Sequence, residues 1–258
     1  PVTEDSKALL TLCVPLHCPE AKPAPIIDGN LMDWQRVISD TGVSLGSSIR
    51  RTERPADDPF PEPPPAKASA LDEQQANDDS SEQEKPVRVF GANAALSWDS
   101  EALYVACIVE DDTFTQDYSA AEVWRQDSIQ LAFDLLNNGS DRMEPDGSMT
   151  PGYGPDDCEI ALANTPDGPQ VTVIKGPKDV KQGVRADASL AMRRDGRNTI
   201  YEARLPWALL PGVRPESGAR FGMDILVNNF EDGDRYTLGW VDGIGAGKYP
   251  ALFVPVII

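Results

Sequence analysis

The sequence predicts an all-β protein that folds as an antiparallel β-sandwich. After about residue 86, short runs rich in β-branched and aromatic residues follow one another at the spacing typical of such sandwiches. Clusters of Gly, Pro, Asn and Asp separate these runs and supply the turns between strands. Helical periodicity is nearly absent, because apolar residues seldom recur at intervals of three and four. Together these three features favour a sandwich over a mixed or helical fold.

The individual strands follow from these runs. A turn at Asp99, Ser100 and Glu101 joins the two clearest ones, 94–98 and 102–109. Asp224 and Asn228 interrupt a later apolar run, so this strand either carries a polar, functional face or approaches solvent at its end. Pro255 cannot donate to a ladder, so the last run is expected at a sheet edge. The expected strands are 87–90, 94–98, 102–109, 128–135, 159–164, 170–175, 189–193, 199–205, 220–228, 235–240 and 252–257.

The order of segments predicts one large domain with an N-terminal lead-in. Residues 1–25 hold a short strand-like run, 8–14, followed by proline-rich sequence that leads into a sandwich domain of residues 26–258. Within that domain, residues 52–84 are rich in acidic residues and proline and have few bulky apolar side chains. Such a stretch buries too little surface to offset its ordering entropy. We interpret it as a disordered insertion, with a functional acidic loop as the alternative.

Charge excludes several partners. The net charge of -19 argues against nucleic acid, because phosphate binding needs a basic face. It also disfavours an anionic membrane surface, and no apolar run approaches the ~20 residues that span a bilayer. The acidity fits a soluble extracellular or salt-adapted protein, or one that binds a divalent cation.

The cysteines and the first residue point toward an extracellular or periplasmic location. Cys13 and Cys18 are close enough in sequence for a small disulfide loop in an oxidising compartment. Cys107 lies in a strand pattern and is expected in the core, whereas Cys158 is either free or paired. The start at Pro1 is compatible with removal of a signal peptide.

The single histidine narrows the possible chemistry. A Ser-His-Asp triad would have to use His17, and no nucleophile-elbow motif is present. A zinc site of the histidine type would lack a second imidazole. Paired carboxylates could serve a glycoside hydrolase, but that assignment needs a separation that sequence does not supply. We therefore predict a binding protein rather than an enzyme.

Residues 94–134 carry the features that suggest binding. Trp124 has polar neighbours, so its ring is a candidate platform for a sugar, with capping of the sheet edge as the alternative. Calcium takes roughly 6–8 oxygen ligands, commonly carboxylates and carbonyls from loops. One structural calcium is therefore expected among the loop carboxylates, although Asp127 could equally bond loop amides. The candidate metal ligands are Asp111, Asp112, Asp127 and Asp157.

The order of these motifs resembles the family 9 carbohydrate-binding modules and their DOMON-like relatives. The segments that carry the resemblance are 26–34 (IIDGNLMDW), 96–112, 123–134 (VWRQDSIQLAFD), 201–210 and 218–240. The resemblance implies a jelly-roll or immunoglobulin-like sandwich with bound calcium as a structural element. It also implies a site in which two tryptophans clamp a sugar ring.

The resemblance maps onto this site only in part. Trp124 matches the first tryptophan of the clamp. In the loop expected to carry the second, residues 241–250, Tyr249 is the only aromatic residue. The acidic residue that the family uses falls at Gln130, and its basic residue in the next strand has no counterpart. Gln130 and Glu159 are the expected polar contacts to a sugar.

These observations predict a non-catalytic carbohydrate-binding module of an exported, multidomain protein, monomeric or tethered to other domains. Its partner would be an oligo- or polysaccharide. The missing second tryptophan leaves an alternative, a structural or protein-interaction sandwich that has lost the sugar site. A haem-binding DOMON-like domain is the third reading. It is disfavoured because His17 lies outside the domain body and Met143 and Met149 lie in a loop.

Overall fold

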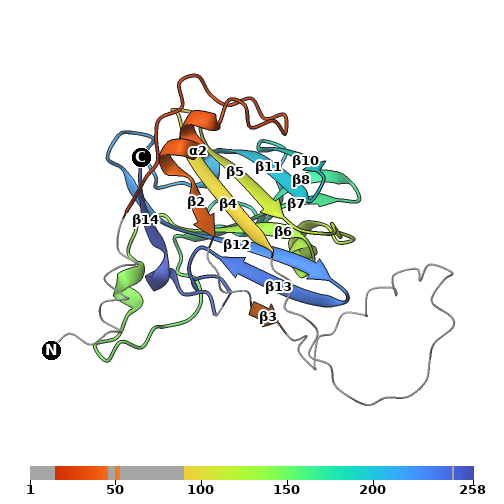
Figure 1. Ribbon diagram of the computed structural model, residues 1–258. Helices are drawn as coiled ribbons and strands as arrows, with labels where there is room; N and C mark the ends of the chain where they lie inside the picture. The colour runs from red at the N-terminus through yellow and green to blue at the C-terminus, as the bar shows by residue number, and fades with distance from the viewer. Residues whose placement is uncertain (1–14, 46–49, 53–89, 246) are drawn as a thin grey trace, which may run out of the picture.

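The chain forms two β-sheets that pack face to face in the computed structural model (Figure 1). The structure describes residues 15–45, 50–52, 90–245 and 247–258. Within these ranges one sheet has nine strands and the other has five. The predicted all-β sandwich is therefore confirmed. The runs expected at 8–14 and 87–89 and nearly all of the acidic segment 52–84 lie outside the described residues.

The nine-stranded sheet is organised around its longest strand, β12. The strand order is β1-β14-β12-β6-β7-β8-β9, with β13 paired to β12 and β3 paired to β13. One edge of β12 pairs first with β14 and then with β13, while β6 occupies the other edge. The bounds are β1 (Leu16–His17), β3 (Arg50–Thr52), β6 (Ser128–Asp134), β7 (Asp157–Thr165), β8 (Gly168–Lys175), β9 (Gly183–Val184), β12 (Arg220–Glu231), β13 (Asp234–Gly239) and β14 (Val254–Ile257).

The five-stranded sheet is antiparallel throughout, in the order β10-β11-β5-β4-β2. Its central hairpin, β4 and β5, is the pair predicted around the turn at Asp99, and it begins three residues earlier than expected. The bounds are β2 (Val43–Leu45), β4 (Gly91–Trp98), β5 (Ala102–Glu110), β10 (Ser189–Asp195) and β11 (Asn198–Pro206).

Helical structure in the described ranges is short. The one α-helix is α2 (Gln35–Thr41), and four 3-10 turns accompany the strands. One of these turns directly follows β11, with Pro206 at its N-cap. The 3-10 turns are η1 (Ala120–Arg125), η2 (Gly139–Arg142), η3 (Trp207–Leu209) and η4 (Pro250–Leu252).

Apolar side chains from both sheets fill the space between them. Phe133 and Phe221 are fully buried there, with ring centroids 6.1 Å apart. Cys107 and Cys158 are buried thiols in the same core, and burial raises the pKa of each to about 12. The prediction that Cys107 is a core residue is confirmed. Cys18 is also a buried thiol, but Cys13 lies outside the described residues, so the predicted disulfide is not described either.

The prediction that the last strand is an edge strand was wrong. β14 lies between β12 and the short parallel strand β1. Pro255 is tolerated because β1 pairs only with the two residues that follow it, Val256 and Ile257. The missing amide of Pro255 therefore leaves no gap in the β1 ladder.

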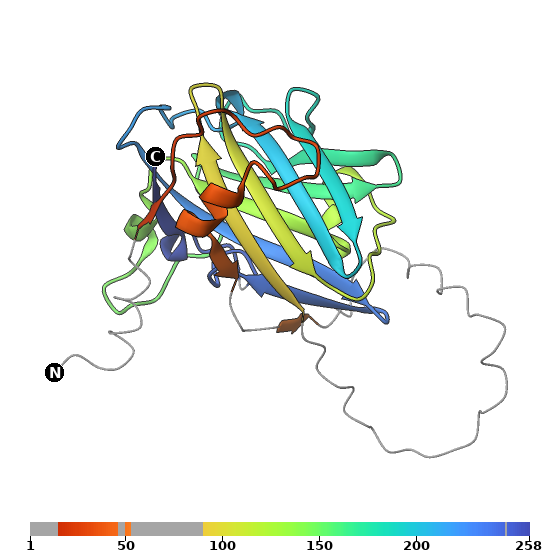
Figure 2. The same ribbon diagram turned by 45° about the horizontal axis from the view of Figure 1, so that its top comes forward.

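One carboxylate fixes the segment that crosses the outer face of the five-stranded sheet (Figure 2). Glu202 of β11 is fully buried and accepts the indole N–H of Trp34 at 2.7 Å. Its other oxygen accepts the backbone N–H groups of Asp28, Gly29 and Asn30 at 3.1, 2.5 and 3.0 Å. Gly29 has φ +80, which favours glycine. The motif IIDGNLMDW is thus a loop wrapped around one buried charge.

The outer face of the nine-stranded sheet carries two apolar covers. At one end Val123 of η1 packs on Ala161 and Ala163 of β7. At the other end, residues after β13 bring Ile244 and Phe253 onto the sheet. Between these covers β6, β7 and β12 present polar side chains. This polar strip, made of Gln130, Glu159 and Asn228, is where the candidate site lies.

Candidate functional site

The polar strip is buried although it faces outward from the sheet. Gln130 is 4% exposed, and Glu159 and Asn228 are each 2% exposed. The side chains come together because Asn228 pairs across to Ser128 and Gln130 pairs across to Ala161 in the strand register. Buried polar groups need partners, since an unsatisfied one costs about 1–3 kcal/mol.

A continuous chain of hydrogen bonds supplies those partners. The Asn228 amide donates to Gln130 Oε1 at 3.0 Å and to the Ser128 hydroxyl at 3.1 Å. The Gln130 amide in turn donates to Glu159 Oε1. Two residues separated by 98 positions in sequence, Asn228 and Gln130, are therefore joined to the carboxylate of a third strand.

Tyr153 and Lys248 close one end of the polar strip. The Tyr153 hydroxyl donates to Glu159 Oε2 at 2.5 Å, and Lys248 Nζ lies 2.8 Å from the same oxygen. Burial and the Glu159 carboxylate raise the pKa of Tyr153, so it remains a donor at physiological pH. The ammonium of Lys248 also lies 5.6 Å from the centre of the Tyr153 ring.

Trp124 and two arginines form the other end. The Arg125 and Arg235 guanidinium carbons lie 4.8 and 4.9 Å from the centre of the Trp124 ring. Arg235 Nη1 donates to Asn228 Oδ1 and to the Trp124 carbonyl, both at 3.2 Å. Arg125 is held by Glu122, with Nε 2.7 Å from its carboxylate. The partly buried indole is thus linked through Arg235 to the polar strip.

The loop 241–250 lies beside the polar strip on the outer face of the nine-stranded sheet, and Asp224 of β12 anchors it. This residue is fully buried, and its carboxylate accepts the backbone N–H groups of Val241 at 3.1 Å and Ile244 at 2.9 Å. Burial raises the pKa of Asp224 to about 7. A side chain at Gly243 would come within 2.7 Å of the Phe253 ring, which explains a glycine there. The loop thereby places the ammonium group of Lys248 next to the Glu159 carboxylate.

Three of the four predicted ligand residues belong to this arrangement. Gln130 and Glu159 form the centre of the strip, and Trp124 stands at its end. Tyr249 lies in the loop, half-buried beside Gly247, and its backbone N–H donates to the Gly243 carbonyl at 2.6 Å. Among the described residues, its side chain takes no part in the hydrogen-bond chain.

Sequence reasoning did not single out Tyr153, Arg235 and Lys248. No local pattern marks these residues, because each comes from a loop or from β13 and reaches the strip only through the fold. Asn228 did leave a signal, since it interrupts an apolar run, and the structure assigns that polar face to the strip rather than to a solvent-facing strand end.

The predicted calcium ligands are divided between two ends of the sandwich. Asp127 accepts the backbone N–H of Phe230 at 2.8 Å and that of Thr115, and burial raises its pKa to about 7. Asp111 accepts the Thr113 amide at 3.1 Å. Asp112 contacts Arg197 at 2.8 Å. These three carboxylates hold loops, in line with the alternative stated for Asp127.

Asp157 cannot share an ion with those three. Asp127 precedes β6 and Asp134 ends it, so the seven-residue strand separates them by roughly 20 Å. Asp157 pairs with Asp134 across β6 and β7 and therefore lies at the far end. The four predicted ligands therefore do not form one group: Asp157 lies apart from Asp127, and Asp111 and Asp112 follow β5 of the other sheet.

A different carboxylate cluster gathers around Asp157. Ligand oxygens of Asp134, Asp156 and Asp157 all lie within 4.8 Å of one another. Asp134 is 2% exposed, yet among the described residues its Oδ1 has no hydrogen-bond partner, and neither has the buried Oδ2 of Asp156. Burial raises the pKa of Asp134 and Asp157, and neighbouring carboxylates raise each further. This acidic cluster joins the ends of β6 and β7.

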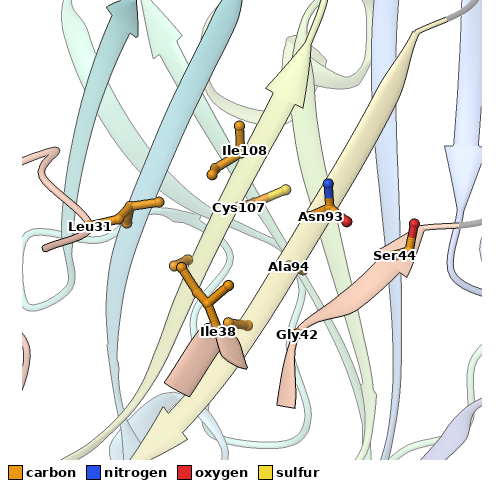
Figure 3. A pocket seen from close by; sticks show the side chains of 10 residues that line it. Leu31, Ile38, Gly42, Ser44, Asn93, Ala94, Cys107 and Ile108 are labelled. Atoms are coloured by element: carbon orange, nitrogen blue, oxygen red, sulfur yellow. The ribbon is translucent and has the colours of Figure 1, made fainter. Parts of the chain in front are cut away.

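A hollow of about 210 Å³ lies on the opposite side of the molecule, outside the five-stranded sheet. Figure 3 shows Leu31, Ile38 and Ile108 on its wall, with Asn93 and Ser44 on the side of β2. Among the described residues no aromatic side chain lines it, and one amide and one hydroxyl are its only polar side-chain groups, because the Cys107 thiol lies in the core between the sheets. A sugar needs a flat apolar surface and several hydrogen-bond partners, so the strip with Trp124 is the better candidate.

Comparison with known proteins identifies the fold and the family. A profile of the family described as carbohydrate family 9 binding domain-like matches residues 66–251. This chain belongs to that family. The family consists of carbohydrate-binding, non-catalytic modules, which agrees with the predicted resemblance and with the prediction of a binding module rather than an enzyme.

Solved structures of family 9 modules share the fold. A carbohydrate-binding module family 9 from Caldicellulosiruptor kristjanssonii in complex with glucose matches with a TM-score of 0.59 at 18% identity, covering 95% of each chain. A module of the same family and organism in complex with cellotriose matches with a TM-score of 0.58 at 19% identity, covering 93% of this chain and 92% of the other. At these identities the likeness concerns the fold alone.

Two further comparisons complete the description. A search of curated proteins gives no match. Among the helices in the described ranges, none has the length and apolar character required to cross a membrane.

Proposed function

We propose that this family 9 module is a non-catalytic sugar-binding domain whose ligand lies on the polar strip against Trp124. The observation that carries the proposal is the continuous chain of hydrogen bonds from Arg235 through Asn228 and Gln130 to Glu159. This chain of hydrogen bonds places polar groups beside the partly exposed indole of Trp124 on a rigid sheet. An indole face packs against the C–H groups of a pyranose, while amides and carboxylates bond its hydroxyls.

Trp124→Ala is expected to weaken sugar binding at least tenfold, which corresponds to about 1.4 kcal/mol. The reason is that the variant removes the ring while the strip remains in place. Glucose and cellotriose, the ligands of the similar structures, are the first probes, and calorimetry or NMR titration measures the dissociation constant.

Two matched variants separate stacking from general damage. Trp124→Phe keeps an aromatic face and should retain most of the affinity. Leu136→Ala removes an exposed apolar side chain elsewhere, 61% exposed, and should change nothing. If Trp124→Ala binds its best sugar as tightly as the parent, the platform role is wrong.

We propose further that the acidic cluster of Asp134, Asp156 and Asp157 holds a structural calcium ion. Asp134 and Asp156 each have a buried carboxylate oxygen with no hydrogen-bond partner in the described part of the chain, and ligand oxygens of the three aspartates lie within 4.8 Å of one another. Oxygen donors of this kind suit calcium better than softer metals. When bound, the ion would neutralise the repulsion among the three charges and join the loops that follow β6 and precede β7.

Calcium is expected to raise the melting temperature. A ligand present at 100 times its dissociation constant stabilises the folded state by about 2.7 kcal/mol, or roughly 5–10 °C for a domain of this size. Thermal scans with 10 mM calcium and with chelator measure the shift. Asp156→Asn should abolish it and should also stabilise the calcium-free protein, because one of three repelling charges is gone.

Asp146→Asn is the matched control, since Asp146 is an exposed acidic residue in the same connection between β6 and β7. It should keep the full calcium effect. Identical melting curves with calcium, with chelator and in Asp156→Asn would contradict the calcium proposal and leave the sugar proposal untouched.

One observation favours a second candidate function, a structural or protein-interaction sandwich without a sugar site. The polar side chains of the strip satisfy one another and are at least 96% buried, since none of the three exceeds 4% exposure. Tyr249 also replaces the tryptophan that the family resemblance leads one to expect in loop 241–250. Failure to bind any sugar of a broad glycan array, with calcium present, would favour this candidate.

We also propose that the protein is exported and carries further domains. The acidic composition and the proposed calcium site support export, because extracellular calcium modules work at dissociation constants of about 10⁻⁴–10⁻³ M, which only calcium-rich compartments satisfy. A calcium dissociation constant in that range, measured by titration, would agree with this proposal, and one below about 10⁻⁶ M would contradict its argument.

A further inference from the structure

The acidic cluster and the polar strip share two strands. On β6, Asp134 follows Gln130 by four residues, and on β7, Asp157 precedes Glu159 by two. Side chains at even intervals along a strand point to the same face, so all four lie on the outer face of the nine-stranded sheet. The proposed calcium site and the proposed sugar site are therefore neighbours on one surface.

One segment, residues 152–157, belongs to both sites, and we call it the linking turn. It supplies two of the three aspartates of the acidic cluster. It also carries Tyr153, whose hydroxyl donates to Glu159 Oε2 at 2.5 Å. The Gly154 N–H closes the turn by donating to Asp157 Oδ2 at 2.5 Å. Movement of the aspartates therefore moves the tyrosine that contacts the strip.

Lys175 of β8 holds the linking turn in place. Its ammonium group donates to the Gly154 carbonyl at 2.5 Å and to the Asp157 carbonyl. It also lies 5.9 Å from the centre of the Tyr153 ring, within the range of a cation–π contact. The position of the linking turn therefore depends on one side chain from a neighbouring strand.

The linking turn also contacts the loop that carries Lys248. The Gly152 N–H donates to the carbonyls of Gly247 and Lys248 at 3.2 and 2.8 Å. Lys248 Nζ in turn lies 2.8 Å from Glu159 Oε2, the oxygen that also accepts the Tyr153 hydroxyl. Two contacts to one carboxylate oxygen of the strip thus depend on the linking turn.

Charge repulsion within the acidic cluster acts against this arrangement. Ligand oxygens of its three carboxylates lie within 4.8 Å of one another. Asp134 Oδ1 and Asp156 Oδ2 are buried without a hydrogen-bond partner in the described part of the chain. A divalent cation removes the repulsion and gives these oxygens a partner. It thereby favours the conformation in which Tyr153 and Lys248 meet Glu159.

We infer that the linking turn couples the two sites, so that calcium at the acidic cluster strengthens sugar binding at the polar strip, with Lys175 as the residue that positions the turn. This inference rests on the proposed sugar site and the proposed calcium site and adds an energetic link between them. The coupling is reciprocal, because both ligands favour the same conformation.

Titrations of the whole chain with cellotriose test the coupling. The dissociation constant, measured by calorimetry, should be at least about fivefold lower with calcium than with chelator, the lower end of the usual range of coupling between sites. Calcium titrations with and without saturating cellotriose should give the same factor. Asp156→Asn should bind cellotriose with one affinity in both conditions.

Lys175→Met tests the linking turn, because it keeps the apolar stem of the side chain and removes the ammonium group. The coupling factor should fall below about twofold. Lys178→Met is the matched control at an exposed position shortly after β8, and it should keep the factor of the parent. Melting curves with calcium and with chelator show whether each variant is folded and binds the ion.

The outcomes separate this inference from the proposals on which it rests. Equal sugar affinity with calcium and with chelator, in a protein that calcium stabilises, would overturn the inference and leave both sites standing. Absence of sugar binding in either condition would overturn the inference together with the sugar site. Absence of any calcium effect on melting would overturn it together with the calcium site. A folded Lys175→Met variant with the parent's coupling factor would overturn the role of Lys175.

Discussion

Replacement of Glu202 by alanine is expected to lower the free energy of unfolding by about 3 kcal/mol, because it leaves four donors without their acceptor. The donors are the backbone N–H groups of Asp28, Gly29 and Asn30 and the indole N–H of Trp34. Each buried donor without a partner costs about 1–3 kcal/mol, and water can reach some of them once the loop opens. The melting temperature should fall by roughly 10 °C.

Two comparisons make this prediction specific. Glu202→Gln keeps one acceptor oxygen and should lose less stability than Glu202→Ala. Glu216→Ala, at an exposed position, should melt like the parent. Hydrogen exchange should show faster exchange at Gly29 and Asn30 in Glu202→Ala than in the control. A variant that melts within about 2 °C of the parent would show that the carboxylate does not anchor the loop.

The second large effect is a loss of stability as the pH rises, which Asp224→Asn should reduce. The pKa of Asp224 is about 7 in the folded protein and about 3.9 in an unfolded chain. Between these values the folded state binds a proton that the unfolded state does not. The free energy of unfolding therefore falls as the pH rises from about 4 to 7, by up to about 4 kcal/mol from this residue.

Other buried carboxylates contribute in the same direction. The pKa of Asp127 is also raised by burial to about 7, so the parent should be markedly more stable at pH 5 than at pH 8. Asp224→Asn should remove about half of this difference, because Asp127 still titrates. Urea unfolding at both pH values, with chelator present to exclude metal effects, measures the slope.

Asp195→Asn provides the matched control, since Asp195 is exposed at the end of β10, and its slope should equal that of the parent. An Asp224→Asn variant with the parent's full slope would show that the buried charge under loop 241–250 does not govern the pH dependence. A parent protein more stable at pH 8 than at pH 5 would contradict the raised pKa of both residues.

The sequence was a reliable guide to the strands for a physical reason. A strand buried on one face alternates apolar and polar residues, and a strand buried on both faces is apolar throughout. The runs between turn residues show these patterns. β5 is an example, since all but one residue of the run 102–109 are buried in the structure. The predicted strand boundaries are less accurate. β4 begins at Gly91 rather than at residue 94, and a glycine has no side chain that could mark the start of a strand.

The candidate site was less accessible from sequence. Trp124 was found from its polar neighbours and its match to the first tryptophan of the clamp. Gln130 and Glu159 were found from the two strands in which the family resemblance expects polar contacts. Arg235 and Lys248 were not found, since each acts on residues more than 75 positions away, Trp124 and Glu159. Which aspartates lie together was equally hidden from sequence, because only the pairing of β6 with β7 brings Asp134 beside Asp157.

By itself, the sequence determined the fold class, the turns, the acidic character and the family of this protein, because these depend on local patterns and their order. Only the tertiary structure decided which polar groups share the space beside Trp124, and that Asp134, Asp156 and Asp157 form the acidic cluster. Strand register brings side chains together from distant parts of the chain, and a shift of one residue would turn each to the other face.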